Sequence, residues 1–374
     1  MPRFATGVVS RVLAERQGII RLMVRVGEAD RRATGFTEVT GALSPGDRVV
    51  VNTTAVDLGL GSGGEDFVVW NLAHTEAGVL SGGHILKVRY TPWQIDTLAA
   101  EAPESPHHVA LAAASDIDGM PVVACGLHSQ VPAVAAVLKR RDPALGIAYL
   151  MTDGAALPLA HSDLVARLKD KGVIDVTITC GHAFGGDLEC VNVFSGLAAA
   201  RHVVGAGVAI VAMGPGIVGT GTVLGHTGME QGQILSAAAS LGGRPVAALR
   251  ISFAEARERH RVVSHHSLSA LRYGALARST VAVPRLPGGR EAEVLERLSA
   301  AEITERHDVV VVEAGETLDA LGHFGLEPRT MGRSVADDPA FHLAAGAAGI
   351  LASEAAPLPA AEGGQRCAPE GPRP

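Results

Sequence analysis

Histidines and carboxylates recur in the loops that follow apolar, strand-like segments of the sequence. The apolar runs Val173–Cys180 and Val208–Met213 each end in a glycine-rich loop that carries such side chains. Parallel strands buried on both faces read as continuous apolar runs, and α/β proteins place their chemistry in the loops at the carboxyl ends of those strands. We therefore expect one shared site at one edge of a sheet. Its candidate catalytic side chains are His128, His182, Asp187, Glu189, His226, His265 and His266.

One chemistry that suits this inventory uses a divalent metal ion. Catalytic metal sites combine imidazole and carboxylate ligands with an open position for water or substrate. The sequence contains no compact signature such as H-E-x-x-H, so the ligands would come from separate loops. The ligands that we predict are His182, Asp187, His226 and His265. The identity of the cofactor stays open, with a divalent metal as the candidate.

Two metal-free alternatives use the same loops. Histidine titrates near neutrality, so His128, His182 or His226 beside a carboxylate would serve in acid–base catalysis. A nucleophile would be Ser129 or Cys125, with a histidine as its base. The surrounding sequence CGLHSQ does not fit the G-x-S-x-G elbow, in which glycines flank the nucleophile.

The segment MGPGIVGTGT at residues 213–222 formally contains the spacing G-x-G-x-x-G. A dinucleotide site also needs a helix that opens at once and an acidic residue about twenty positions further on. The next helical pattern begins near Glu230, and residues 235–249 contain no acid, which argues against a nicotinamide or flavin cofactor. The loop is either a tight turn between packed elements or an anion-binding loop. In the second interpretation the binding residues are Gly214, Gly216, Gly219, Thr220, Gly221 and Thr222.

Composition limits the classes of partner. The 32 Lys and Arg residues against 39 Asp and Glu give a net charge of −7, and aromatic residues make up only 3%. An acidic chain with few stacking side chains argues against nucleic acid or an anionic membrane as a partner. The four cysteines form no Cys-x-x-Cys pair, and the chain begins without an apolar stretch of signal-peptide length. We expect a cytoplasmic protein with reduced thiols.

The order of sequence patterns predicts two structural parts. Residues 1–75 show alternating segments separated by turn residues, which is typical of a small all-β barrel or sandwich. Residues 76–106 form a connecting segment. Residues 107–353 alternate apolar strand-like runs with helical patterns, which indicates a three-layer, mostly parallel, Rossmann-like α/β sheet. Residues 354–374, rich in Pro, Ala, Gly and charge, are predicted to be a disordered tail.

Several of these segments also carry a resemblance to a known family. They are NTTAVDLGLGSGG, MTDGAALP, TCGHAFGGDLE, MGPGIVGTGT, SHHSLSAL and DDPAFHLAAGAAG. With them the chain resembles an uncharacterised bacterial family catalogued as domain of unknown function 3866, from about residue 4 to about residue 352. The resemblance implies no activity, so it transfers no catalytic residue to this chain.

The functional expectation therefore rests only on the residues of these loops. We expect an enzyme that acts on a small polar or anionic metabolite, with metal-dependent or histidine-assisted hydrolysis as the reaction class. The alternative is a non-catalytic metabolite-binding or assembly protein that uses the same loops. The expected partner is a small molecule, with neither nucleic acid nor membrane, and self-association into a homo-oligomer is left open.

Overall fold

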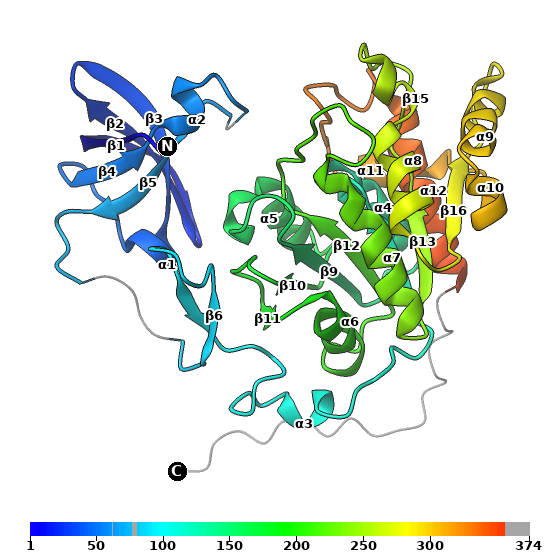
Figure 1. Cartoon of the computed structure of the whole chain (residues 1–374), viewed down its shortest axis with the longest axis horizontal. Coiled ribbons are helices and arrows are strands. Elements are labelled where there is room, and N and C mark those ends of the chain that lie inside the picture. Colours follow the sequence, from blue (N-terminus) through cyan, green and yellow to red (C-terminus); the bar gives the residue numbers. More distant parts are fainter. Residues whose placement is uncertain (62, 77–80, 356–374) are drawn as a thin grey trace.

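A computed structural model describes residues 1–61, 63–76 and 81–355 of the 374-residue chain. The described residues form a small β-barrel beside a larger α/β part (Figure 1). Most of the predicted tail, residues 356–374, lies outside the described residues, while Glu354 and Ala355 belong to the last helix. Among the helices of the described segments, none has the length and apolarity needed to cross a bilayer.

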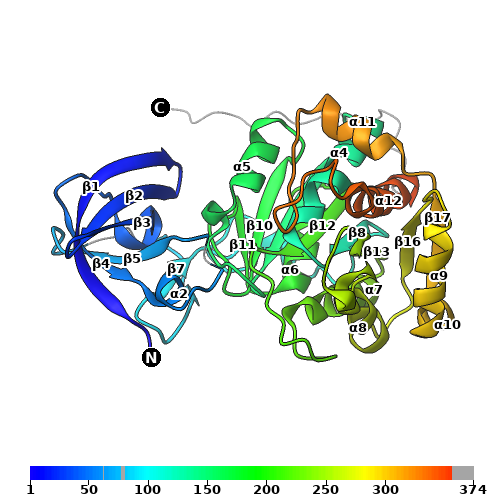
Figure 2. The same ribbon diagram turned by 90° about the horizontal axis from the view of Figure 1, so that it is seen from above.

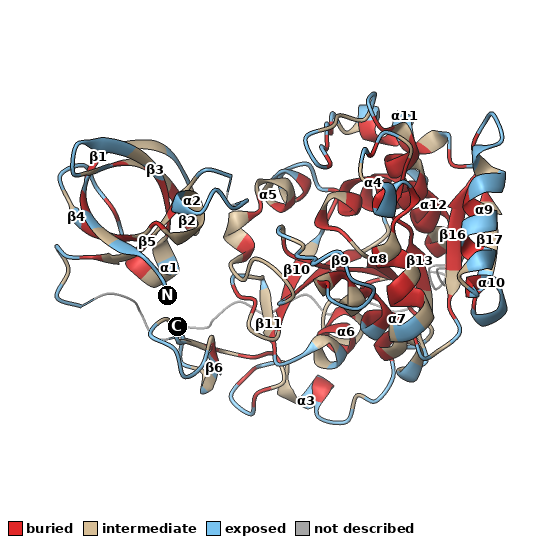
Figure 3. Cartoon of the chain, turned by 45° about the horizontal axis from the view of Figure 1, so that its top comes forward, coloured by how far each residue is buried: buried red, intermediate tan, exposed pale blue. Residues whose placement is uncertain are grey.

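The first part is a closed five-stranded barrel. Its strands are β1 (Phe4–Arg16), β2 (Ile19–Val26), β3 (Ala29–Phe36), β4 (Arg48–Asn52) and β5 (Asp66–Asn71). They follow the order β1-β2-β3-β5-β4, with β4 paired to β1 and β3 parallel to β5, which is the topology of OB-fold barrels. Alternate residues such as Ile20, Leu22 and Val24 fill the interior, as the period-two pattern predicts (Figure 3). Two short helices, α1 (Thr37–Thr40) and α2 (Thr54–Asp57), lie in its connections.

The barrel contacts the α/β part through two ion pairs and through the packing of aromatic rings. Arg16 and Arg21 each place a guanidinium nitrogen on the carboxylate of Asp163, at 2.9 and 2.7 Å. The ring of His161 packs against Phe36 and Phe67, with centroids about 6 Å away. These contacts join the barrel strands β1, β2, β3 and β5 to the start of helix α5 (Asp163–Asp170) and to the turn before it.

A short hairpin links the two parts. Its strands are β6 (Ile85–Lys87) and β7 (Ile95–Thr97), which pair antiparallel, and helix α3 (His108–Leu111) follows. The side chain of Lys87 reaches out of the hairpin to the carboxyl ends of the α/β strands, where it donates to the carbonyls of Thr179 and Ala183.

The second part is built on one eight-stranded sheet in which every pair is parallel. Its strands are β8 (Pro121–Cys125), β9 (Ile147–Thr152), β10 (Val176–Cys180), β11 (Leu188–Cys190), β12 (Val208–Met213), β13 (Arg244–Ala248), β16 (Thr280–Pro284) and β17 (Asp308–Val312). The spatial order is β11-β10-β9-β12-β8-β13-β16-β17. The predicted parallel α/β sheet beside an all-β barrel is therefore confirmed.

Helices cover both faces of this sheet (Figure 2). One face carries α4 (Val131–Arg141), α5 (Asp163–Asp170), α11 (Glu316–His323) and α12 (Pro339–Ala355). The other carries α6 (Val193–His202), α7 (Glu230–Ser240), α8 (His265–Ser269) with the π-helical Ala270–Gly274, α9 (Arg290–Ala300) and α10 (Ile303–Arg306). Strand residues alternate between the two cores: Val123 packs with the first group and Val122 with the second. Both faces of the sheet are therefore shielded from solvent, which explains why the strands read as continuous apolar runs in the sequence.

The strand order creates a switch point between β8 and β12. These strands are neighbours, but the helix after β8 is α4 on one face and the helix after β12 is α7 on the other. Their connections diverge and open a crevice at the carboxyl edge of the sheet, where open α/β sheets bind ligands.

Candidate histidine metal centre

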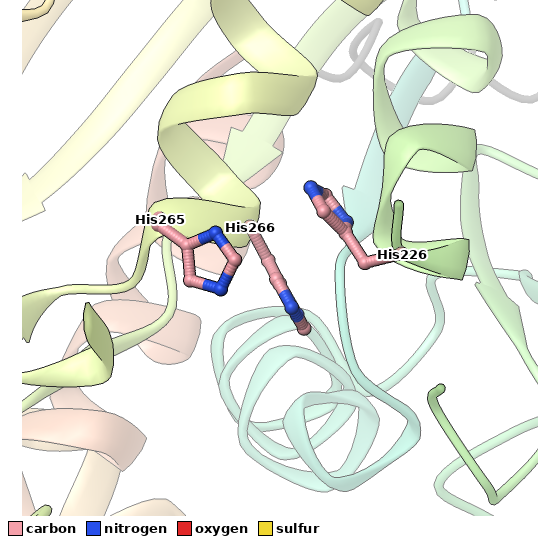
Figure 4. A group of neighbouring side chains, drawn as sticks. All are labelled: His226, His265 and His266. Atoms are coloured by element: carbon pink, nitrogen blue, oxygen red, sulfur yellow. The ribbon is translucent and has the colours of Figure 1, made fainter. Parts of the chain in front are cut away.

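Three histidines from two separate segments gather above the carboxyl edge of the sheet. His226 follows the glycine-rich loop after β12, and His265 and His266 are the first residues of α8 (Figure 4). One ring nitrogen of each lies within 4.8 Å of the others. A fourth ring, His260, lies 4.9 and 4.8 Å from His265 and His266, centroid to centroid. We call His226, His265 and His266 the histidine cluster.

Local structure fixes the two segments that carry the histidine cluster, the loop with His226 and the start of α8. A bridge between Gly219 and His226 closes the glycine loop, so that His226 points back towards α8. The antiparallel pair β14 (Ile251–Ser252) and β15 (Val262–Val263) returns the chain after β13 to the sheet edge. Ser264 then caps α8, because its hydroxyl accepts the N–H of His266 at 3.2 Å.

The hydrogen bonds of the histidine cluster leave lone pairs free. Nε2 of His226 lies 3.1 Å from the carbonyl oxygen of Val223, which only accepts, so this nitrogen carries the proton and Nδ1 is the free acceptor. Nδ1 of His226, Nε2 of His265 and Nδ1 of His266 are buried without a hydrogen-bond partner among the described residues. A buried polar atom without a partner costs about 1–3 kcal/mol. A cation bound among the three rings would give buried nitrogens of this kind a partner.

The rings of the histidine cluster are held in the neutral form that binds metal. Burial is the main cause that lowers the pKa of His226 and His265, and it lowers the pKa of His266 to about 2. The neighbouring imidazoles and the buried Arg250 add repulsion that depresses the pKa of His266 further. A neutral imidazole has a lone pair to donate, so no proton has to be displaced at neutral pH.

Cationic side chains border the histidine cluster. Arg250 is buried beside Glu255, at 3.5 Å, and burial lowers its pKa to about 10. Arg259 is exposed, has no carboxylate partner among the described residues, and lies over the glycine loop, 3.9 Å from where a Cβ on Gly221 would be. Its charge contributes to lowering the pKa of His265. The cluster is therefore suited to an anion at its rim.

The structure does not bring the other predicted metal ligands to this cluster. His182 and Asp187 follow β10, which is four strand positions from β13 in the sheet. At roughly 4.8 Å per strand, β10 lies about 19 Å from β13 and about 10 Å from β12, whose loop carries His226. Among the described residues, the group of possible metal ligands that contains His226 and His265 also contains His266, and it does not contain His182, Asp187 or Glu189.

His182, Asp187 and Glu189 have structural partners instead. Nδ1 of His182 accepts the N–H of Val88 at 3.0 Å. Asp187 accepts from the hydroxyl and N–H of Thr177 and pairs with Lys169. Glu189 accepts from Lys87, Thr179 and the N–H of Gly185. These contacts bind the hairpin and the β10–β11 loop to the edge of the sheet.

Comparison with known proteins gives one match. A family model described as "Protein of unknown function (DUF3866)" matches residues 32–349, which is most of the chain. The chain belongs to this family. The comparisons with curated proteins and with solved structures gave no match. The match to the DUF3866 family therefore covers the parallel sheet and both segments that carry the histidine cluster, but of the barrel only the strands β4 and β5 and the larger part of β3, and it adds no activity.

The switch-point crevice is a second concave site of this DUF3866 chain, with a volume of about 530 Å³. Gly214 and Gly216 of the predicted anion loop line it, together with the end of β8 at His128 and Ser129. Arg167 and Arg329 line it as well, and neither has a carboxylate partner among the described residues. The start of the glycine loop thus borders the crevice, and its end carries His226.

The rest of the predicted anion loop lies elsewhere. The hydroxyls of Thr220 and Thr222 are 3.0 Å apart and bond to the backbone of Gly225, which stabilises an exposed turn. Gly219 lies against His266, and Gly221 lies beside Arg259. These residues shape the loop over the histidine cluster and do not line the crevice.

His128 is buried in the wall of the crevice and is not part of the histidine cluster. Its Nδ1 and Nε2 lie 3.0 Å from the Tyr149 hydroxyl and 2.7 Å from the Ser162 hydroxyl. Burial lowers its pKa to about 4, so it is neutral at pH 7. Because both of its ring nitrogens are hydrogen-bonded, His128 has a structural role and links the end of β8 to the start of α5.

Three side chains beyond the predicted set matter here. His260 completes a ring of four imidazoles, and Arg259 supplies the free charge beside them. Glu230, one helical turn after His226, has its pKa raised to about 7 by burial and by the charge of Asp153. These three residues lie in the same loops as the predicted site residues, and that position is the only feature of the sequence that points to them. Their residue types alone do not distinguish them from other loop residues.

Proposed function

We propose that this protein is a metal-dependent enzyme that hydrolyses a small anionic metabolite, with the metal held by His226, His265 and His266. The observation that supports this most directly is that each of the three histidines has a buried ring nitrogen without a partner among the described residues, and that one ring nitrogen of each lies within 4.8 Å of the others. In a tetrahedral zinc site the bonds are about 2.0–2.1 Å, which sets ligand nitrogens about 3.3 Å apart. Binding would therefore draw the rings closer together.

The donor set favours catalysis over a purely structural role. Structural zinc sites use four protein ligands, whereas catalytic sites use three and keep a position for water or substrate. A divalent ion at such a position supplies Lewis acidity and lowers the pKa of bound water. Arg259 would hold the anionic group of the substrate at the rim, and Arg250 adds positive potential from below.

We also propose a bacterial, cytoplasmic setting with a small molecule as the partner. Cys125, Cys180 and Cys190 are buried free thiols, which suits a reducing compartment. The acidic net charge and scarcity of aromatic residues favour a metabolite over nucleic acid.

The test is metal content together with a hydrolase screen. Untagged protein is purified without chelator, and its bound metals are measured by mass spectrometry for the wild type, His266→Ala and the exposed control His323→Ala. We expect close to one zinc-type ion per chain in the wild type and control, and a loss of about 100-fold in affinity in His266→Ala. Hydrolysis of phosphate and carboxylate esters should follow the same order.

Two results would reject the proposal in different ways. No stoichiometric metal in the wild type, even after incubation with Zn²⁺, would remove the metal centre. Tight metal binding with saturable metabolite binding and no turnover would instead favour the non-catalytic alternative.

A further inference from the structure

A second large cleft lies between the barrel, the β6–β7 hairpin and the β10–β11 loop. Its volume is about 1070 Å³, and all three parts of the chain contribute to its walls. The barrel supplies Trp70 on β5 and Glu38 on α1, the hairpin supplies Trp93, and the α/β part supplies Phe184. We call this the tryptophan cleft. It is separate from the histidine cluster, because β10 and β11 form one edge of the sheet, at least two strand positions from β12 and at least four from β13.

The aromatic residues of the cleft are unusual for this chain. Aromatics make up only 3% of the sequence, and both of its tryptophans line this cleft. Trp70 and Trp93 are half-buried, so each exposes part of its ring to the cleft. A face of an indole ring attracts a cation through its quadrupole, more strongly than other aromatic rings do.

All the charged side chains among the described lining residues of the tryptophan cleft are acidic. Its described lining residues include no Lys and no Arg, but they include the carboxylates Glu38, Glu76, Asp96, Asp187 and Glu189. Three of these are already compensated: Asp187 by Lys169, Glu189 by Lys87, and Asp96 by hydrogen bonds from Ser81. The two lysines, Lys87 and Lys169, do not line the cleft, whereas Ser81 does.

Glu38 is the uncompensated carboxylate nearest to the α/β wall. It has no hydrogen bond or ion pair within the described residues, and its carboxylate lies beside Gly185, 3.6 Å from where a Cβ on that glycine would be. The N–H of Gly185 donates to Glu189 at 2.7 Å, so both carboxylates approach the same glycine. Burial and the charge of Glu189 together raise the pKa of Glu38. A cation in the cleft would relieve this repulsion.

We propose that the tryptophan cleft binds a small organic cation, whose apolar body packs between the indole rings and whose positive charge faces Glu38. The location agrees with the general preference of small-molecule sites for domain boundaries. The site is independent of the metal centre, so the protein would bind two chemically different small molecules.

Intrinsic fluorescence tests this proposal directly, because every tryptophan of the chain lines the cleft. Choline is titrated into the full-length protein, and its neutral isostere 3,3-dimethylbutan-1-ol serves as the matched ligand. We expect a saturable change in tryptophan emission with choline and a response to the alcohol that is about tenfold weaker.

Variants then separate charge from packing. Glu38→Gln should weaken choline binding about fivefold while leaving the circular dichroism spectrum and the metal content unchanged, because the carboxylate makes no contact that the fold needs. Glu28→Gln, in the exposed turn between β2 and β3, is the control and should bind as the wild type does. The proposal is overturned by the absence of a saturable response to choline, by an equal response to the alcohol, or by wild-type affinity in Glu38→Gln.

Discussion

The imidazole ring of His226 stacks on that of His266, with centroids 4.0 Å apart and ring planes inclined by only 15°. Such close contact is compatible with two neutral rings, since two imidazolium ions at this distance would repel each other strongly. The stack is bordered by glycines: a Cβ on Gly228 would lie 3.1 Å from Nδ1 of His226, and one on Gly219 would lie 2.9 Å from Nε2 of His266. The glycines therefore restrict the positions of the His226 and His266 rings.

The first prediction concerns Gly219→Ala. Nothing in its backbone conformation forbids alanine, but the new methyl group would collide with His266 and turn its ring away from the cluster. We expect the affinity for Zn²⁺, measured by calorimetry on metal-free protein, to fall about tenfold. The free energy of unfolding should change by less than about 1 kcal/mol, because the loop is exposed.

The control for this substitution is Gly315→Ala, where a Cβ would meet no atom within 4 Å and the backbone angle is ordinary. Its Zn²⁺ affinity should equal that of the wild type. Unchanged affinity in Gly219→Ala would show that the ring of His266 is not a ligand.

The second prediction is a pH dependence of stability that is traced to Glu230. Burial raises the pKa of this carboxyl from 4.5 in the unfolded chain to about 7 in the folded protein. The folded state therefore keeps a proton that the unfolded state releases, and the stabilisation that is full below pH 4.5 is lost as the pH rises through 7. Relative to Glu230→Gln, the wild type should lose about 2 kcal/mol of unfolding free energy between pH 5 and pH 8.

Urea denaturation at the two pH values, with chelator present so that metal does not contribute, measures this difference. A difference between wild type and Glu230→Gln that is the same at pH 5 and pH 8 would mean that the carboxyl titrates normally.

Much of the fold could be predicted because its strands are buried on both faces. The strand Val208–Met213 has the same bounds in the sequence prediction and in the structure, since every one of its residues is buried. Strand β11 could not be predicted from periodicity, because three residues are too few to show a period. Residues Phe253–His260 form no continuous helix: only Glu258–His260 makes a 3-10 turn, and Glu255 accepts from the N–H of Arg257 and pairs with Arg250, which holds the segment in a turn.

The candidate site was predicted less completely, because loops can be read from the sequence but strand order cannot. The chain returns from β11 to place β12 between β9 and β8, so consecutive loops end far apart. His226 and His265 meet only because the β14–β15 pair folds α8 back over the glycine loop. That contact depends on tertiary packing, which no local spacing encodes.

The third prediction separates Glu189 from any catalytic role. The ammonium group of Lys87 is buried and lies 2.5 Å from the carboxylate of Glu189. Removing one partner leaves the other charge buried and unpaired, so Lys87→Met and Glu189→Gln should each cost about 3 kcal/mol of unfolding free energy. The double variant should cost clearly less than the sum, by about 2 kcal/mol. Additive costs would show that the two side chains do not interact, and loss of metal from Glu189→Gln would return this residue to the metal site.

The fourth prediction concerns the thiols and tests the cysteine form of the nucleophilic alternative. Burial raises the pKa of Cys180 to about 12 and raises those of Cys125 and Cys190 further, so none of these cysteines forms a thiolate at pH 8. Because the thiolate is the reactive form, iodoacetamide should leave all three unmodified in the native protein and alkylate them fully in urea. Peptide mass spectrometry reads each site separately, with glutathione in the same tube as the reagent control. Rapid alkylation of Cys125 in the native state would contradict this expectation and restore Cys125 as a candidate nucleophile beside β8.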